Sequence, residues 1–294
     1  MGSRLTTAPF LLARPDLRTM TDEATAFVPG HVTGFFTVHR DDDPTASGSQ
    51  GAGVTLADGV SVTVERAEDR RVELNGRPAS VEAVETVLET LGVEGAVVAE
   101  TDLPIGSGFG ISGAMALGTA LATNRVYERD LSRNELVTIA HGADVQAGTG
   151  LGDVVAQAAG GMPIRLEPGG PQHNVIDAVP YRPRIEYVTF GELDTGEVIG
   201  GDTELISKAG TEALSRLVSE PTPAQFAYAS RRFARESGLL TDRLRDAIRD
   251  VSEAGGEASM AMLGETVFAL GTGLSDAGYD PDACRVDAAG ARLV

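Results

Sequence analysis

The sequence predicts an α+β protein with two lobes. Strand-like segments dominate the beginning of the chain, and helical segments mixed with antiparallel strand candidates follow. The regular alternation of strands and helices that indicates a parallel sheet is missing. A proline- and glycine-rich segment at 167–173 is the candidate boundary. We therefore expect an N-terminal lobe over 22–168 and a C-terminal lobe over 169–294.

Strand signals fill the start of the N-terminal lobe. Two apolar, β-prone segments are separated by Pro29-Gly30, and a glycine- and serine-rich loop over 46–53 follows them. Residues 60–65 alternate in polarity as a half-buried strand does, and Asn75-Gly76 ends a further strand in a tight turn. We expect strands at 24–28, 35–39, 60–65 and 72–74.

Helical periodicity appears in the middle of the same lobe. Apolar residues three and four positions apart predict a helix over 80–91, and an apolar run predicts a strand over 95–100. Ser132 and Glu135 form the capping-box pattern that starts a helix ending near Ala147. The other expected elements are helices at 112–127 and 154–159 and a strand at 160–166.

The second lobe is expected to mix helices with strands. Two short strand-like pieces are separated by Gly264, and three helical patterns precede them. We expect strands at 185–190, 258–263, 265–270 and 284–288, and helices at 203–218, 222–236 and 239–253.

The chain is strongly acidic, with a formal net charge of −19. We expect no nucleic-acid partner, because phosphate backbones are bound by basic surfaces. Lys208 is the only lysine. High acidity with almost no lysine is typical of proteins from salt-accumulating halophiles, where cations screen the repulsion. An ordinary acidic protein from a GC-rich genome is the alternative.

The lengths of the apolar runs and the number of cysteines indicate the cellular compartment of the protein. No apolar run approaches the roughly 20 residues of a membrane span, so we expect no membrane partner. Residues 1–20 lack the apolar centre of a signal peptide, and the segment 1–21 is expected to be a disordered extension or a misassigned start. The one cysteine, Cys284, excludes an internal disulfide, which favours a cytoplasmic protein.

Several common site types do not fit the sequence. Lys208 does not lie in the Gly-Lys-Ser/Thr pattern of a Walker phosphate loop. A Schiff-base enzyme would have to use this same residue, so both site types are disfavoured. The pattern Gly108-x-Gly110-x-x-Gly113 matches the dinucleotide fingerprint, but Pro104 and polar residues separate it from the preceding strand. No G-x-S-x-G motif is present, and the four histidines are scattered, without zinc-ligand spacing.

The segment 96–126 is the most informative part of the chain, and its residues 105–113 are Ile-Gly-Ser-Gly-Phe-Gly-Ile-Ser-Gly. Glycines allow the backbone to turn its N–H groups toward a ligand. The helix expected directly afterwards adds partial positive charge at its N-terminus. The segment therefore predicts a site for the phosphates of a nucleotide.

With its flanks, Pro104-x-x-x-Gly108-Phe109-Gly110-Ile111-Ser112-Gly113-Ala114, this loop resembles the P-x-x-x-G-L-G-S-S-A-A phosphate loop of the GHMP kinase superfamily. Segment 27–36 stands in the place of that family's first motif. The run 140–153 has the order of its metal-binding acid and catalytic aspartate. Together with the loop 48–53, this run looks like the archaeal pantoate kinases of the superfamily. The resemblance covers roughly residues 25–270.

The match departs from the family pattern at three places. Ile111 replaces the first serine of the serine pair, Asp144 stands where glutamate is usual, and the third motif is reduced to Met262-Leu263-Gly264-Glu265.

The resemblance implies a lobe like ribosomal protein S5, a ferredoxin-like C-terminal lobe, and ATP between them. It implies that Asp153 is the catalytic residue and that Ser112 and Asp144 hold Mg²⁺. The expected ATP-binding residues are Pro104, Gly106, Ser107, Gly108, Gly110, Ser112 and Gly113. The expected substrate-binding residues are His31, Ser49, His141 and Arg165.

These side chains suit a kinase chemically, but each also has an ordinary structural interpretation. Carboxylate oxygens suit Mg²⁺, and a carboxylate beside an alcohol can position or deprotonate it. Equally, Ser112 and Asp153 can cap helices, and Asp144 can be a solvated helix acid. Arg165 can lie on the surface, and Ser49 can belong to a flexible turn.

We therefore expect ATP-dependent phosphorylation of pantoate to 4-phosphopantoate in coenzyme A biosynthesis. The expected cofactors are ATP and Mg²⁺, and a homodimer is the assembly considered. A kinase of the same fold for another small alcohol (homoserine, mevalonate or shikimate) is the first alternative. A non-catalytic nucleotide-binding protein with a degenerate kinase fold is the second.

Overall fold

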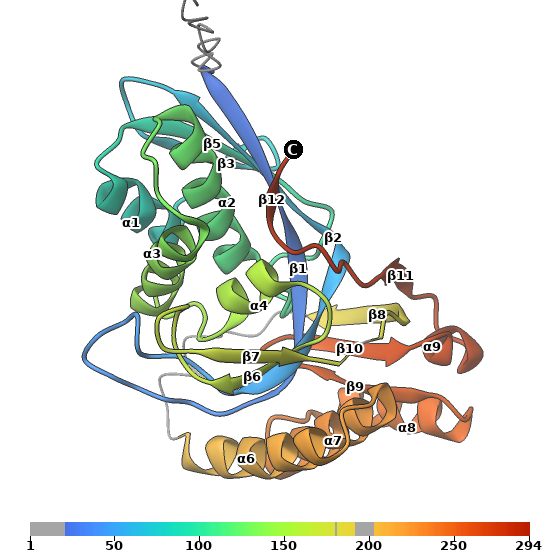
Figure 1. Ribbon diagram of the computed structural model, residues 1–294. Coiled ribbons are helices and arrows are strands. Elements are labelled where there is room, and N and C mark those ends of the chain that lie inside the picture. Colours follow the sequence, from blue (N-terminus) through green and yellow to red (C-terminus); the bar gives the residue numbers. More distant parts are fainter. Residues whose placement is uncertain (1–20, 180, 192–202) are drawn as a thin grey trace, which may run out of the picture.

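The computed structural model describes residues 21–179, 181–191 and 203–294. The expected N-terminal extension, apart from Thr21, therefore lies outside the described residues. The described chain has the predicted α+β fold, built on an eight-stranded and a four-stranded sheet (Figure 1). Within these ranges, no helix is both long and apolar enough to cross a membrane.

Two long strands form the centre of the larger sheet. β1 (Glu23–Phe36) and β2 (Gly51–Arg66) pair antiparallel along most of their length. The prediction of two strands separated by Pro29-Gly30 was wrong, because β1 runs through this pair and only shifts its register with β2 there. Proline is tolerated where a ladder is irregular. The predicted loop over 46–53 is shorter than expected, because β2 already begins at Gly51.

Shorter strands extend the larger sheet on both sides. β5 pairs antiparallel with β2, and β3 pairs parallel with β5. Two strands beyond residue 168 also join this sheet, since β7 pairs with β6 and β12 pairs with β1. Neither was predicted. The shorter strands are β3 (Arg71–Leu74), β4 (Arg77–Pro78), β5 (Gly95–Glu100), β6 (Pro163–Glu167), β7 (Val175–Ala178) and β12 (Arg292–Leu293).

Helices pack on one face of the larger sheet (Figure 1). α2 lies against β1 and β2, and it also contacts the other three helices of this layer, α1, α3 and α4. Gly118 of α2 permits this approach, because a Cβ there would lie 2.5 Å from Cγ2 of Val62. The predicted capping box of Ser132 and Glu135 is confirmed at the start of α3. These helices are α1 (Glu82–Leu91), α2 (Ile111–Val126), α3 (Arg133–Gln146) and α4 (Asp153–Ala159).

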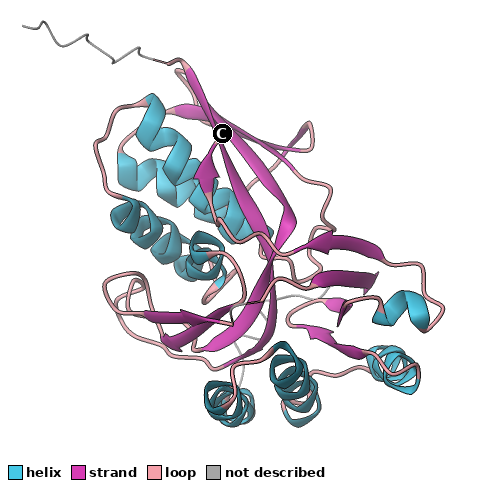
Figure 2. Cartoon of the chain, turned by 45° about the vertical axis from the view of Figure 1, so that its right-hand side comes forward, coloured by secondary structure: helices cyan, strands magenta, loops and turns pink. Residues whose placement is uncertain are grey.

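The smaller sheet has the antiparallel order β11-β8-β10-β9. Its main helices appear nearly end-on along the lower edge of Figure 2. The last predicted strand begins and ends earlier than 284–288, and Val286 forms only an isolated bridge with Leu56. The elements are β8 (Arg184–Gly191), α6 (Glu204–Ser219), α7 (Pro223–Glu236), α8 (Asp242–Glu253), β9 (Glu257–Ala261), β10 (Glu265–Leu270), α9 (Gly273–Asp276) and β11 (Asp282–Arg285).

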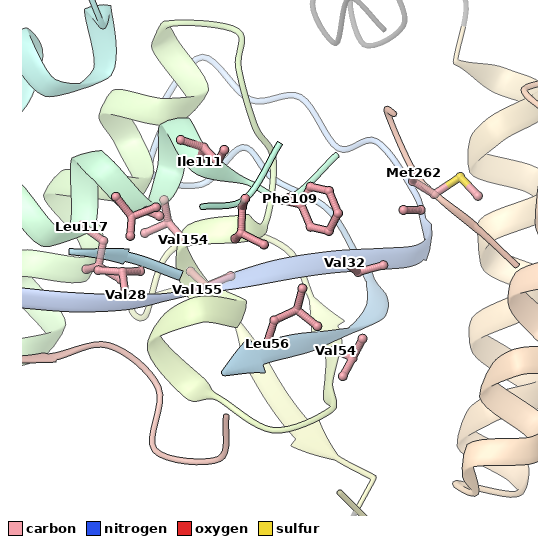
Figure 3. Close-up of a cluster of buried hydrophobic side chains, with 14 of the residues drawn as sticks. Val28, Val32, Val54, Leu56, Phe109, Ile111, Leu117, Val154, Val155 and Met262 are labelled. Atoms are coloured by element: carbon pink, nitrogen blue, oxygen red, sulfur yellow. The ribbon is translucent and has the colours of Figure 1, made fainter. Parts of the chain in front are cut away.

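The two sheets share buried contacts. α7 packs against both β1 and β9. The ring centroids of Phe35 in β1 and Phe226 in α7 are 6.3 Å apart. Figure 3 shows another part of the same apolar core, a cluster that includes Phe109, Val32, Leu56 and Met262. Burying side chains of this size contributes about 1.5–3 kcal/mol each. This cluster fixes the glycine-rich loop that carries Phe109.

Candidate active site

The glycine-rich loop joins β5 to α2 and has an unusual backbone. Gly106, Gly108 and Gly110 have φ angles of 72°, 88° and 66°, which favour glycine. A Cβ on Gly108 would lie 3.0 Å from the carbonyl oxygen of Met262. The turn between β9 and β10, which holds the reduced third motif, therefore packs directly against the loop.

Both sheets anchor this loop. The Phe109 ring meets the Tyr187 ring of β8 edge-on, with centroids 4.9 Å apart. The Phe109 carbonyl accepts a hydrogen bond of 3.0 Å from the His31 amide of β1. Thr266 of β10 donates its hydroxyl to the Ser107 carbonyl at 2.9 Å. The loop is thus held before any ligand arrives.

The start of α2 is left open for an anion. Gly110 is the N-cap and supplies no side-chain acceptor to the first turn. Its carbonyl accepts a hydrogen bond of 2.9 Å from Nε2 of Gln157, a buried side chain of α4. The first-turn residues 111–113 line a cavity, and free amides at a helix start bind phosphate groups.

That cavity has a volume of about 250 Å³ and a mixed lining. Leu74, Val81 and Ile105 are among its apolar members, together with Met115 and Leu263. Its polar side chains are Thr33, Ser49, Ser112, Asp144, Thr149, Asp153 and Arg165. An apolar wall with a few convergent polar groups is the usual composition of a small-molecule site.

Asp144, near the end of α3, connects to α2 through the hydroxyl groups of Thr149 and Ser112. Thr149 donates its hydroxyl to Oδ1 of Asp144 at 2.7 Å, and its Oγ1 lies 2.9 Å from Oγ of Ser112. Burial raises the pKa of Asp144 to about 7, against the lowering effect of Thr149 and with a raising contribution from the charge of Asp153.

Asp153, the first residue of α4, forms a hydrogen bond with a side chain of β1. Its Oδ1 lies 2.7 Å from Nδ1 of His31, a fully buried side chain. Burial pushes the pKa of Asp153 upward, but the hydrogen bond and charge of His31 and the charge of Arg165 outweigh it and hold this pKa below its ordinary value. For His31 the effect of burial has the opposite sign: burial lowers the pKa of its imidazole, against the raising effect of Asp153. Asp153 is therefore ionised at neutral pH.

Arg165 on β6 completes the polar side of the cavity. Its Nε donates to the Ser49 carbonyl at 3.3 Å, and burial lowers the pKa of its guanidinium to about 10. Its Nη1 is buried without a hydrogen-bond partner in the described chain. A Cβ on Gly152 would lie 2.6 Å from Nε of Arg165, so this glycine makes room for the guanidinium.

The structure brings most of the predicted site residues to this cavity. Four of them do not line it. Pro104 and Ser107 belong to the glycine-rich segment but are not in the cavity lining, and His31 contacts the lining residues Asp153 and Thr33. His141 shares the helix α3 with Asp144, but its Nε2 lies 2.8 Å from the Ser47 carbonyl and it is almost completely buried.

Sequence reasoning missed Thr149 and Gln157. Thr149 lies in the second glycine-rich loop, and Gln157 lies one helical turn after Asp153. Their positions close to recognised motifs were the available signal. The partners that give them meaning, Ser112 and Gly110, come from a distant part of the chain.

The residues present suit Mg²⁺. In the described ranges no three His, Cys, Asp or Glu side chains form a metal cluster, but Mg²⁺ in kinases commonly uses one or two carboxylates plus substrate phosphates. A Cβ on Gly150 would lie 2.1 Å from Oδ2 of Asp144 and 3.3 Å from Oδ2 of Asp153. Two carboxylates thus border the same small space, which only a glycine leaves free.

Known proteins are similar to this chain over most of its length. The family "GHMP kinases N terminal domain" matches residues 79–161. A pantoate kinase of Thermococcus kodakarensis is 37% identical over 264 residues, 83% of this chain and 86% of that protein. A pantoate kinase of Methanospirillum hungatei is 36% identical over 256 residues, 84% and 87% of the two chains.

A solved structure described as a phosphotransferase related to the CoA biosynthesis pathway has a TM-score of 0.82 and 33% identity. The match covers 92% of this chain and 98% of that one. Sequence and structure are therefore similar over both sheets, beyond the phosphate-binding segment alone. The chain belongs to the pantoate kinase family of the GHMP kinases.

Proposed function

We propose that this protein transfers the γ-phosphoryl group of ATP to the 4-hydroxyl group of pantoate, which yields 4-phosphopantoate for coenzyme A biosynthesis. The observation that carries the proposal is one cavity bordered by the open start of α2, Asp144, Asp153 and Arg165, in a chain of the pantoate kinase family. ATP-dependent kinases need these parts: phosphate donors, oxygen ligands for Mg²⁺, and a group that orients the acceptor.

The ATP phosphates would be bound by the loop 106–110 and by the first turn of α2. Backbone amides bind them without a lysine, which suits a chain whose only lysine, Lys208, lies in α6. Ser112 and Asp144 would hold Mg²⁺, which neutralises phosphate charge when bound. The apolar residues Leu74, Val81 and Ile105 offer a surface for the purine ring.

Arg165 and Ser49 would bind the carboxylate of pantoate. A buried guanidinium with a free Nη1 is costly unless an anion pairs with it. The planar fork of arginine matches a carboxylate, so bound pantoate would supply the missing partner. His141 would act at a distance, because it holds the Ser47 carbonyl two residues before Ser49.

Asp153 would orient the 4-hydroxyl group by accepting its hydrogen bond. An ionised aspartate with a lowered pKa is a weak base. In a loose phosphoryl-transfer transition state the acceptor gains acidity late, so positioning contributes more than early deprotonation. His31 fixes the carboxylate for this purpose, with its Nδ1 2.7 Å from Oδ1.

Coupled ADP-release measurements at high KCl test the proposal. Pantoate should support turnover, while homoserine, mevalonate and shikimate should not. The variant Asp153→Asn should lose about 10²- to 10⁴-fold in kcat, and the exposed Asp69→Asn should retain it. Turnover with another alcohol but not with pantoate would show that this alcohol is the acceptor and that pantoate is not. ATP binding without ADP release would favour a non-catalytic protein.

Two further parts of the proposal concern assembly and location. The homodimer considered from the sequence is the first of them. Light scattering at high KCl measures the assembly directly. A cytoplasmic location, where ATP is available, is tested by fractionation of the native cells.

A further inference from the structure

Thr149 lies between the two side chains proposed to hold Mg²⁺. Its Oγ1 is 2.7 Å from Oδ1 of Asp144 and 2.9 Å from Oγ of Ser112. Its amide also donates to the Asp144 carbonyl at 3.2 Å, so the residue is tied to the end of α3 by main chain and side chain. It lines the same cavity as its two partners.

The chemistry of the three groups gives their hydrogen bonds one direction. A carboxylate that holds a cation is ionised and only accepts hydrogen bonds, so in the cation-bound state the single hydroxyl proton of Thr149 points to Asp144. The oxygen of Thr149 can then only accept from Ser112. The Ser112 proton is therefore directed into this group, toward Thr149 Oγ1 or the Asp144 carboxylate, and the lone pairs of Ser112 Oγ remain available to a cation.

A simple structural role would not produce this arrangement. A threonine that only stabilises the loop would be satisfied by the Asp144 carbonyl, which its hydroxyl also approaches at 3.3 Å. The shorter contacts instead go to the side chains of two different helices, α2 and α3. The hydroxyl of Thr149 thus couples the orientation of Ser112 to that of Asp144.

We propose that Thr149 is a positioning residue that holds the Ser112 hydroxyl and the Asp144 carboxylate as a matched pair of oxygen donors for the divalent cation of the nucleotide. The inference rests on the proposed function of those two residues. Partners behind metal ligands are commonly worth 10- to 100-fold in metal affinity. We expect an effect of this size from the Thr149 hydroxyl alone.

The experiment measures Mn²⁺ binding to the full chain saturated with ADP, from the electron paramagnetic resonance signal of free Mn²⁺. Thr149→Val removes the hydroxyl and keeps the shape, and it should weaken Mn²⁺ binding by about 10- to 100-fold. Thr149→Ser should bind Mn²⁺ as the parent protein does. In turnover, Thr149→Val should need more Mg²⁺ at an unchanged KM for pantoate.

Thr90→Val is the matched control. The Thr90 hydroxyl of α1 also donates to a carbonyl, at 2.8 Å from Thr86, but it is exposed and outside the cavity. It should leave Mn²⁺ binding unchanged. If Thr149→Val does not fold, Thr149→Ala removes the same hydroxyl without the added methyl group, and melting temperatures show which variant to use.

The outcomes separate this inference from the proposed function. Normal Mn²⁺ affinity in Thr149→Val, or weak affinity in both Thr149→Val and Thr149→Ser, overturns the role of the hydroxyl. Ser112→Ala and Asp144→Asn are measured in parallel. If these two also bind Mn²⁺ normally, the proposed metal site itself is refuted.

Discussion

Asp144→Asn should make the metal-free protein more stable at alkaline pH while it removes activity. Asp144 is buried, and its pKa is raised from 3.8 to about 7. Asparagine keeps an acceptor at Oδ1 for Thr149 and has no charge to desolvate. The variant therefore removes the energetic cost of ionising Asp144 and little else.

The sign and size follow from the two pKa values. Between about pH 4 and pH 7 the unfolded protein has lost the Asp144 proton while the folded protein retains it, so folding stability from this group falls as pH rises. One pKa unit corresponds to about 1.4 kcal/mol. The shift of about three units thus sets an upper limit of about 4 kcal/mol, reached above pH 7.

Urea unfolding at pH 4.5 and pH 8, in EDTA and high KCl, measures this difference. We expect Asp144→Asn to exceed the parent by up to about 4 kcal/mol at pH 8 and by about 1 kcal/mol or less at pH 4.5. The exposed Asp69→Asn is the matched control at both pH values. A gap that is absent at pH 8, or that widens toward acid, would show that Asp144 is not a buried carboxylate with a raised pKa.

Three further predictions concern turnover. Because a proton competes with the cation at Asp144, the Mg²⁺ concentration for half-maximal rate should rise up to about tenfold per pH unit below pH 7, measured by Mg²⁺ titrations at pH 6 and 7.5. Gly150→Ala should lower kcat by about 100-fold or more, because its Cβ would lie 2.1 Å from Oδ2 of Asp144; Gly148→Ala, whose Cβ meets nothing within 4 Å, should stay active at some cost in stability. His31→Ala should lower kcat and move the acidic limb of the pH–rate profile upward, because the pKa of Asp153 loses the hydrogen bond that lowers it; an unmoved limb would contradict that role.

Local sequence signals predicted most individual elements. The capping box of Ser132 and the strand over 95–100 depend on residues close together in the chain, and both were confirmed. The error at Pro29-Gly30 has a different origin. β1 pairs with the long strand β2 on both sides of this position, so the strand continues despite the register shift there. β12 has only two residues, too few to produce a periodic signal. Its pairing with β1 depends on tertiary structure alone.

The same distinction applies to the site. The spacing of Asp144 and Asp153 marks them in the sequence, and both line the cavity. Spacing alone does not single out Thr149, since one of its two side-chain partners, Ser112, lies 37 residues earlier in the chain. His141 shows the converse, because two residues three positions apart on one helix can be buried against different neighbours.

The surface charge and the site charge of this protein obey different rules. A net charge of −19 destabilises the compact chain through repulsion between exposed groups, and dissolved salt screens that repulsion. His31 and Arg165 are buried and Asp153 is only partly exposed, and buried or partly buried pairs are screened much less than exposed ones. The chain can therefore carry a strongly acidic surface without weakening the contacts that orient Asp153. It follows that the electrostatics of phosphoryl transfer are set by β1, β6 and the starts of α2 and α4, and not by the net charge of the molecule.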